Sequence, residues 1–402
     1  MSDDDGVTVE YEPRSVKEIL GEMKDIAELL IDLSYSSVLF EDVDLAREVL
    51  ELESRMDVLQ LQARMSLVMA GRRPDEAESL APVLGIVGAA EKISDAAGDI
   101  AKVVREEMGL LPAFRKSLPE AIETLARATV AGESPYLGRT LADINLETET
   151  GVRVVAIRRE DAWFHSPDRE TVLRAGDVLI CRGHEDPLAA VYETVTGTAF
   201  ERPDPASPGV ADLDRAVESV LTMKAMSELG VDLAYSSVLF DSEALATEVR
   251  ELEIEVDALQ SRFEAWTLRA ASEVEDPVSL RGLLHIAAST EVISDAAVEI
   301  SDGVLRGFSS HPVVAAAVAE SDEILARTVL DPDSSLVGGT LSDLADTDAA
   351  GVTVIAVRRA SDDGRSEWEL SPGPDTALRA GDHLIAKGTR SSVSRLEQLA
   401  DA

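Results

Sequence analysis

Apolar residues in the first hundred positions recur at intervals of three and four, which is the pattern of amphipathic helices. In the stretch from Arg14 to Phe40 they occupy Ile19, Met23, Ile26, Leu30, Leu33 and Val38. Similar stripes cover 43–70 and 77–108, and a shorter fourth helix is expected near 118–128. Because short loops join the three long segments, the pattern predicts an antiparallel helical bundle.

A different pattern spans residues 151–183. In the runs GVRVVAIRR and LRAGDVLICRG, apolar residues occupy alternate positions, as in half-buried strands. The glycine of L-R-A-G-D permits a turn, and the aspartate can accept hydrogen bonds from nearby backbone amides. The loop between the two runs carries Trp163, Ser166 and Pro167. This pattern predicts a small β-containing module.

The whole arrangement returns 200 positions later. YSSVLF occurs at 35–40 and again at 235–240, and ISDAA occurs at 93–97 and 293–297. A second strand module runs from GVTVIAVRR to LRAGDHLIAKG, with Trp368, Ser371 and Pro372 in a loop that is five residues longer. One large duplication, and not a short-period repeat, explains this spacing.

The predicted fold class is α+β, with two antiparallel helical bundles that alternate with two small α/β modules. A Pro-rich stretch, ERPDPASPG, separates the two halves as a linker. We expect bundle, module, linker, bundle and module at 1–115, 116–200, 201–210, 211–315 and 316–402.

The charge of the chain limits its partners and its compartment. The formal net charge is −40, and 30 of the 37 basic residues are arginine. Such acidity suits a salty cytoplasm, where repulsion is screened, and disfavours nucleic acids or anionic membranes as main partners. Cys181 is the only cysteine, so an internal disulfide is excluded. Without a signal peptide or a long apolar run, we expect a soluble cytoplasmic protein.

Each long helix of each bundle carries an E-x-x-x-D pair, whose two carboxylates share one helix face. Counted from the turns at about 1.5 Å per residue, neighbouring pairs lie at similar heights. Hard divalent or trivalent cations favour such oxygen clusters. The alternative is a solvated acidic face, which a chain this acidic readily produces. The residues are Glu28, Asp32, Glu53, Asp57, Glu91, Asp95, Glu228, Asp232, Glu253, Asp257, Glu291 and Asp295.

The remaining chemistry does not indicate an enzyme. The five histidines show no ligand spacing, and no Walker motif, Rossmann fingerprint or nucleophile elbow occurs. Arg158 and Arg358 close the first strand run of their modules, where they could grip a phosphate or serve as ordinary surface bases. Pro167 and Pro372 either stiffen their loops or line a pocket.

The strand modules resemble the C-terminal ligand-binding domain of TrkA-type potassium regulators, called RCK_C. The likeness covers 125–198 and 325–400 and rests on G-V-x-V-x-A-I/V-R-R, S-P and L-R-A-G-D-x-L-I-x-x-G. The bundles resemble PhoU, in sequences such as Glu91-Lys-Ile-Ser-Asp95-Ala-Ala and Glu291-Val-Ile-Ser-Asp295-Ala-Ala. Together they are similar to tandem PhoU–TrkA-C proteins of archaea, which are associated with potassium transport.

The resemblance implies a ligand and a metal. RCK_C domains pair, and some bind cyclic di-AMP where two domains meet. PhoU bundles can hold a divalent or iron-type metal at their E-x-x-x-D motifs. The TrkA nucleotide-binding half has no counterpart here. The implied ligand wall is Val154, Val155 and Pro167 in the first module, and Val354, Ile355 and Pro372 in the second.

We therefore expect a non-enzymatic cytoplasmic regulator of potassium or other cation transport. It would sense a small ligand through its RCK_C modules and signal through its bundles to a membrane potassium transporter or channel subunit. The modules would pair within the chain, as an internal pseudo-dimer, or across a homo-oligomer. The alternative is a PhoU-like, metal-binding adaptor in phosphate signalling.

Overall fold

The computed structural model describes most of the chain. The described residues are 15–70, 74–109, 124–160, 162–165, 167, 169–183, 185–200, 210–274, 276–307, 312–320, 324–345, 347, 351–360, 366–370 and 372–401.

Three long helices form the first bundle: α1 (Val16–Phe40), α2 (Val43–Ala70) and α3 (Pro74–Arg105). A capping box starts α1, because Ser15 Oγ accepts from the Glu18 amide and the Glu18 carboxylate accepts from the Ser15 amide. The three predicted long helices of this half are thus confirmed, with ends shifted by a few residues.

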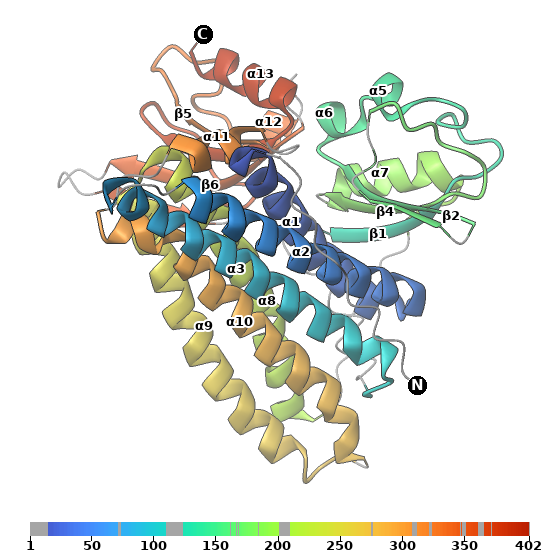
Figure 1. Cartoon of the computed structure of the whole chain (residues 1–402). Coiled ribbons are helices and arrows are strands. Elements are labelled where there is room, and N and C mark those ends of the chain that lie inside the picture. Colours follow the sequence, from blue (N-terminus) through green and yellow to red (C-terminus); the bar gives the residue numbers. More distant parts are fainter. Residues whose placement is uncertain are drawn as a thin grey trace.

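The second bundle repeats this pattern with α8 (Ala211–Phe240), α9 (Glu243–Ala270) and α10 (Arg281–Leu305), the last preceded by the 3₁₀ turn η2 (Pro277–Leu280). Helices α3 and α10 pack antiparallel, since Gly303 lies beside Pro82 while Gly282 lies beside Val103. One hydrophobic core runs through both bundles, which lie side by side (Figure 1).

Two buried tyrosines, Tyr35 and Tyr235, lie at the bundle interface but differ in their hydrogen bonding. Tyr35 of α1 bonds Thr290 of α10, with 2.7 Å between the two oxygens. The Thr290 hydroxyl donates to the Ile286 carbonyl, so the proton in the tyrosine–threonine bond comes from Tyr35. Tyr235, its counterpart in α8, is equally buried, but its hydroxyl has no hydrogen-bond partner. The residue equivalent to Thr290 is Ala90, which has no hydroxyl to offer.

Each strand module is a four-stranded antiparallel sheet. In the first β-module the order is β1-β4-β2-β3, and in the second β-module it is β5-β8-β6-β7. The strands are β1 (Thr124–Thr129), β2 (Arg153–Arg159), β3 (Ala162–His165), β4 (Val178–Gly183), β5 (Ile324–Val329), β6 (Val352–Ala360), β7 (Ser366–Leu370) and β8 (His383–Gly388). The helices of this part are α5 (Leu141–Ile144), α6 (Leu146–Thr150), α7 (Glu185–Thr196), α11 (Pro312–Glu320), α12 (Leu341–Ala345) and α13 (Arg390–Ala400).

The L-R-A-G-D segment forms the predicted turn. Gly176 has φ +86°, and Asp177 Oδ2 accepts from the Arg174 amide at 2.8 Å. The same carboxylate binds the Arg159 guanidinium through both oxygens, at 2.8 and 2.7 Å. The second arginine of the R-R pair therefore holds this turn in place, and Asp382 and Arg359 repeat the arrangement.

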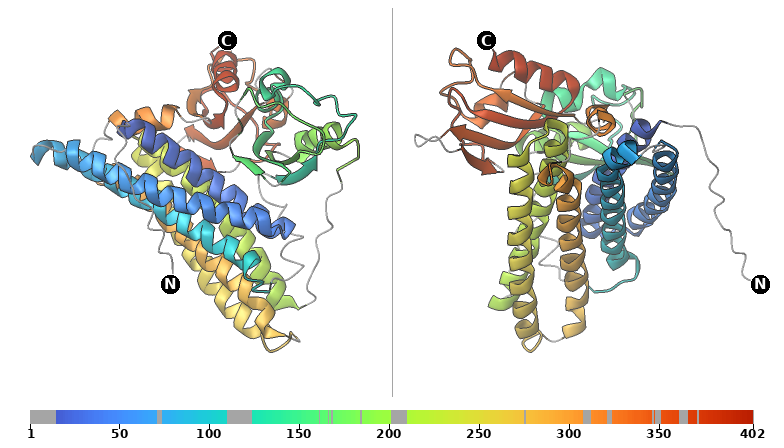
Figure 2. Two further views of the ribbon diagram at one scale, coloured as in Figure 1. Left: turned by 45° about the vertical axis from the view of Figure 1, so that its right-hand side comes forward. Right: turned by 60° about the vertical axis from the view of Figure 1, so that its left-hand side comes forward.

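One face of each sheet lies on the helices, and the other carries the module's own helix, α7 or α13. Val155 and Ile180 belong to the core shared with the bundles, whereas Leu179 packs with α7 in a separate core. Both modules lie on the same side of the helical layer (Figures 1 and 2). Each sheet therefore divides its strand residues between its own core and the bundle.

The two β-modules also touch each other. Thr148 of α6 lies within hydrogen-bond distance of Thr389 and Ser391, with oxygen separations of 3.0 and 3.3 Å. Arg395 of α13 bonds Glu149 at 3.4 Å. We call these residues, with Gly351, the module seam. The two β-modules of one chain are therefore in direct contact.

One predicted helix is wrong in part. The sequence pattern favoured a helix near 118–128, but residues 124–129 form β1, which pairs with β4 along its whole length. Pairing with a strand 49 to 59 positions further along the chain outweighs the local helical preference of T-L-A-R-A-T. The rest of that predicted helix, the Pro-rich linker at 201–209, Ser166 and Ser371 lie outside the described residues.

The two tyrosines should respond differently to loss of their hydroxyls. Tyr35→Phe should destabilise the protein by about 1 kcal/mol, because it removes a buried hydrogen bond. Tyr235→Phe should be neutral or stabilising, because it removes a buried hydroxyl that lacks a partner. Urea unfolding midpoints of the two variants check this, and equal losses in both would contradict it.

Replacement of Gly351 should open the module seam. A β-carbon there would clash with the backbone oxygens of Glu147 and Thr148, which cannot rotate away. We expect Gly351→Ala to cost about 1–3 kcal/mol and to speed hydrogen exchange in α6 and α13. Gly373→Ala is the matched control, because a β-carbon there would meet nothing within 4 Å. Unchanged exchange in the Gly351 variant would show that the seam is loose.

Candidate functional site

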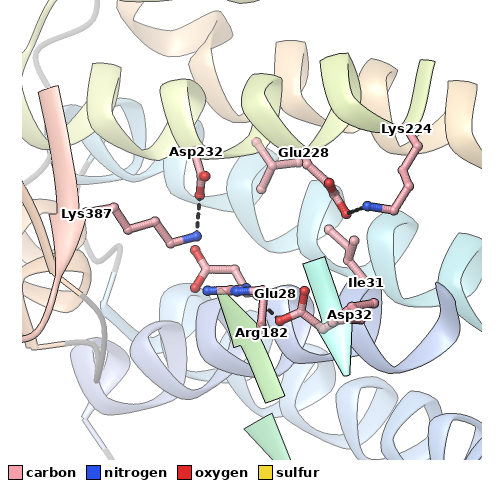
Figure 3. A pocket seen from close by; sticks show the side chains of 10 residues that line it. Glu28, Ile31, Asp32, Arg182, Lys224, Glu228, Asp232 and Lys387 are labelled. Atoms are coloured by element: carbon pink, nitrogen blue, oxygen red, sulfur yellow. Dashed lines mark hydrogen bonds and ion pairs between the residues drawn. The ribbon is translucent and has the colours of Figure 1, made fainter. Parts of the chain in front are cut away.

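A polar cavity lies where α1 and α8 approach each other beside strands β4 and β8 (Figure 3). The cavity has a volume of about 50 Å³ and is partly open to solvent. We call it the central cavity. Its lining residues are Glu28, Ile31, Asp32, Leu125, Arg182, Lys224, Glu228, Val231, Asp232 and Lys387.

Two ion pairs in this cavity join each sheet to the first helix of its bundle. Arg182 of β4 bonds Asp32 of α1 at 2.6 Å, and Lys387 of β8 bonds Asp232 of α8 at 2.9 Å. Both basic side chains are less than 10% exposed. Charge-assisted hydrogen bonds with so little solvent are strong and directional. A sheet cannot shift on its bundle without breaking one of them.

Two buried lysines connect the halves to each other. Lys24 pairs with Glu28 at 2.7 Å, and its ammonium lies 5.5 Å from the ring centroid of Tyr235 in the other bundle. Lys224 pairs with Glu228 at 2.5 Å and lies 4.9 Å from the ring of Tyr35. Each lysine thus carries an ion pair within its own helix and a cation–π contact across the bundle interface.

The E-x-x-x-D pairs of α1 and α8 do not join the other carboxylate pairs. Glu28 and Asp32 face the central cavity, as do Glu228 and Asp232, where lysine and arginine side chains pair with them. Equal height along neighbouring helices gives no information on direction around each helix axis. The sequence analysis therefore placed the carboxylate pairs of all three helices of a bundle together. In the structure, only the pairs of the second and third helices lie on the same face.

The remaining pairs gather on the outer face of each bundle. In the second bundle, one oxygen each from Glu253, Asp257 and Asp295 lies within 4.8 Å of the others, a spacing that could hold a metal ion. Burial and then the charges of Asp295, Asp257 and Glu253 raise the pKa of Glu291.

The first bundle carries the equivalent group. Burial raises the pKa of Glu53, and the charges of Asp95 and Asp57 raise it further, while Lys102 opposes them. For Asp95, burial and then the charge of Glu91 raise the pKa. Metal binding at either face stays a prediction, since neither spacing nor a raised pKa distinguishes a cation site from a solvated acidic face.

The residues of the implied ligand wall are not brought together. Val154 lies in the first module's own core, whereas Val155 faces α1 and belongs to the core of the bundles. Val354 and Ile355 are divided in the same way. A β-bulge between Val154 and Ala156 accompanies this division. The half-buried Pro167 and Pro372 lie in the loops that precede β4 and β8. A ligand role for these six residues stays a prediction.

Arg158 contacts the α1–α2 turn. Its guanidinium lies 3.7 Å from Asp42 and 3.6 Å from Asp44, and 5.8 Å from the ring of Trp163. Arg127 of β1 reaches the same Asp42 carboxylate at 3.0 Å. In this half, Arg158 therefore lies beside two carboxylates. A phosphate contact for Arg158 stays a prediction.

Sequence reasoning missed the basic residues of the central cavity. Arg182 and Lys387 stand at the same place in L-I-C-R-G and L-I-A-K-G, and Lys24 and Lys224 are exactly one repeat apart. In a chain with only seven lysines, a lysine kept at the same repeat position was a usable signal.

Loss of one partner in the central cavity should be costly. Arg182→Gln should lower stability by about 3–5 kcal/mol, because it leaves Asp32 charged in a poorly solvated place. The double variant with Asp32→Asn should recover part of that loss. Arg47→Gln is the control, since its pair with Asp44 is exposed and worth at most about 1 kcal/mol. Urea unfolding at fixed potassium chloride measures all three, and a control-sized effect of Arg182→Gln would contradict the prediction.

Curated and solved relatives share parts of this architecture. A segment of 124 residues is 29% identical to "Probable potassium channel protein 2" of Methanocaldococcus jannaschii and covers 29% of this chain and 35% of that protein. The match therefore spans about a third of the length of this curated relative.

Solved structures give weaker likenesses. PhoU from Pseudomonas aeruginosa aligns with a TM-score of 0.41 and 14% identity over 73% of this chain and 96% of that one. The GsuK RCK domain aligns with a TM-score of 0.18 and 16% identity over 82% and 88%. The GsuK channel bound to NAD gives 0.19 and 16% over 79% and 65%. All three TM-scores lie below 0.5, too low to support a shared arrangement of the whole chain.

Family models assign the domains directly. The PhoU domain matches residues 20–104 and 220–304, which are the two bundles. The TrkA-C domain matches residues 125–196 and 325–401, which are the two β-modules. The chain is therefore a tandem protein of the PhoU and TrkA-C domain families, with two domains of each kind in alternation.

Proposed function

We propose that this protein regulates potassium transport, with the TrkA-C domains as ligand sensors and the PhoU domains as the parts that a membrane transporter or channel recognises. The potassium channel relative and the paired TrkA-C domains support the transport assignment. The central cavity supports the coupling, and it is the observation that carries the proposal.

The coupling follows from the ion pairs that tie each sheet to its bundle. Because Arg182–Asp32 and Lys387–Asp232 are buried, a tilt of either sheet must move α1 or α8 with it. The lysines beside Tyr35 and Tyr235 then pass that movement to the other half. A ligand that prefers one module arrangement shifts the population of bundle arrangements by its difference in affinity.

The module seam is where the two sensors influence each other. Gly351 has room only for a hydrogen atom beside the backbone of α6, so a small change in module orientation breaks the seam. We include cyclic di-AMP among the ligands to test, because the RCK_C resemblance implies it. Among the helices that the structure describes, none has the length and hydrophobicity needed to span a membrane.

A catalytic role finds no support in the cysteine. Cys181 is buried in β4, and burial raises the pKa of its thiol to about 12. A thiol that stays protonated at neutral pH is a poor nucleophile. Both families found are regulatory, which is consistent with a protein that is not an enzyme.

A second function is favoured by the outer carboxylates. If Glu253, Asp257 and Asp295 hold a metal, the PhoU domains could serve as an adaptor in phosphate signalling. This alternative predicts a metal in the purified protein and a phenotype in phosphate supply. It does not require that the modules bind a nucleotide.

The experiment compares potassium uptake, measured with rubidium, and phosphate uptake in the same cells. In a host that lacks the gene, rubidium uptake at limiting potassium should change and should return with the wild-type gene. Gly351→Ala should fail to restore regulation, whereas Gly373→Ala should restore it. Calorimetry with cyclic di-AMP and with AMP, in high potassium, identifies the ligand. Normal rubidium uptake with altered phosphate uptake would reject the potassium assignment in favour of the alternative.

A further inference from the structure

Two exposed apolar positions are the same in both halves of the chain. Val68 of α2 and its counterpart Leu268 of α9 are 75% and 77% exposed. Leu84 of α3 and its counterpart Leu284 of α10 are 43% and 42% exposed. Among the residues that the structure describes, no other repeat position carries a large apolar side chain that is more than 40% exposed in both halves.

This repetition matters because other exposed apolar residues of the helices have diverged. Leu61 is replaced by Ser261 in the second half, and Ile254 stands where the first half has Ser54. A single exposed apolar side chain is normal on a protein surface and needs no explanation. Apolar side chains that stay exposed at the same positions in both copies indicate a contact that both bundles make.

The two apolar positions of a bundle lie at the same level on neighbouring helices. Glu53 of α2 lies against Gly98 of α3, and this contact sets the register of two antiparallel helices. Val68 follows Glu53 by fifteen residues, and Leu84 precedes Gly98 by fourteen. Because each residue adds about 1.5 Å along either helix, Val68 and Leu84 come level with each other.

The apolar residues share their helix faces with the outer carboxylates. Val68 follows Asp57 by eleven residues, and Leu84 precedes Asp95 by eleven. Eleven residues make three helical turns to within about 20°, so each apolar residue lies about 16 Å along the same face from its carboxylate. We call Asp57, Val68, Leu84 and Asp95 the first stripe, and their counterparts Asp257, Leu268, Leu284 and Asp295 the second stripe.

The middle of each stripe carries a small residue. Gly88 of α3 and its counterpart Ala288 of α10 follow the leucine of their stripe by four residues, which is one turn along the same face. A β-carbon at Gly88 would meet nothing within 4 Å, and Ala288 is exposed. Since side-chain size sets the distance between packed helices, another helix could lie close to the stripe here.

Carboxylates repel one another at the polar end of both stripes. Burial and then nearby aspartates raise the pKa of Glu53, while Lys102 opposes them. Burial and then the charge of Asp257 raise the pKa of Asp295, while Lys92 opposes them. A further cation above either end would relieve this repulsion.

The charges around the stripes leave both of them acidic. The carboxylates outnumber the basic side chains in each half. In the first half, the acidic residues are Glu53, Asp57, Glu91, Asp95 and Asp99, and the basic ones are Arg64 and Lys102. In the second half, the acidic residues are Glu253, Asp257, Glu264, Glu291, Asp295 and Glu299, and the basic ones are Lys92 and Arg281.

We propose that each stripe docks a basic amphipathic helix of the membrane partner, whose apolar residues pack on the exposed pair and whose lysines or arginines reach the carboxylates three turns away. Charge complementarity selects this occupant, because cytoplasmic segments of membrane proteins are rich in lysine and arginine. The inference rests on the proposed function and deepens it, since it names the surface and the chemistry of recognition. The stripes run in opposite directions, because α3 and α10 pack antiparallel, so one chain would hold two such helices.

Two synthetic helical peptides of identical composition test this on the full-length protein. In the in-phase peptide, two lysines follow two leucines by eleven residues, on the same face. In the out-of-phase peptide the spacing is nine residues, which turns the lysines to the opposite face. Calorimetry in potassium chloride and EDTA should show two sites per chain for the in-phase peptide and about tenfold weaker binding of the other.

Paired substitutions in the second stripe should remove one of the two sites. Leu268→Ser with Leu284→Ser deletes the apolar pair, and Asp257→Asn with Asp295→Asn deletes two charges at constant size. The first stripe stays intact in both variants, so its remaining site reports that the protein is folded. Val172→Ser is the apolar control, since this exposed residue lies in the first β-module, and Glu193→Gln of α7 is the charge control.

Several outcomes would overturn the proposal. Equal affinity for the two peptides would show only a general attraction of cations to an acidic chain, and equal losses in the control variants would show the same. Binding that requires manganese in place of EDTA would assign the carboxylates to a metal. A wild-type dimer in sedimentation that the double leucine variant loses would assign the stripe to a second copy of this chain. Rubidium uptake reports separately on potassium transport, so failure of the peptide test leaves that assignment in place.

Discussion

The arrangement of this protein depends on buried ion pairs between each sheet and the first helix of its bundle. Apolar contact alone, such as Val155 and Ile180 against α1, is non-directional and would allow the sheet to slide. Arg182–Asp32 and Lys387–Asp232 fix the register instead, because a displaced sheet would leave a charge in a place with little water.

Duplication within one chain has let two copies of this contact diverge. In a homodimer, a change at one turn would appear in both subunits, whereas here the equivalent turn positions carry Asp42 and Ser242. Thr290 and Ala90 have diverged too, which leaves only one of the two interface tyrosines with a hydrogen bond. The fold is nearly two-fold symmetric, but its chemistry is not.

Basic residues are scarce in this strongly acidic chain, so the few that are buried are informative. Acidic residues outnumber basic ones by 77 to 37, so most of the surface repels anions. Lys24 and Lys224 connect the two halves, and Arg182 and Lys387 connect each sheet to its own bundle. The outer faces of the bundles instead carry clustered carboxylates with raised pKa values. Burial and then mutual repulsion make the folded state bind those protons more tightly than the unfolded chain does, so the folded state loses stability as pH rises from the unfolded pKa through the raised one.

The sequence by itself determined the long helices, the duplication, the L-R-A-G-D turns and the domain order, because periodicity and repeat spacing are local or directly countable. It could not separate Glu28 and Asp32 from the outer carboxylates, since height along a helix says nothing about direction around it. It also placed a helix over the start of β1, because a strand that pairs with distant residues is stabilised by them and not by its own composition. Only the tertiary structure brought Arg182 to Asp32 and Arg358 to His383, across 150 and 25 positions of the chain, since such pairs form where separate elements pack.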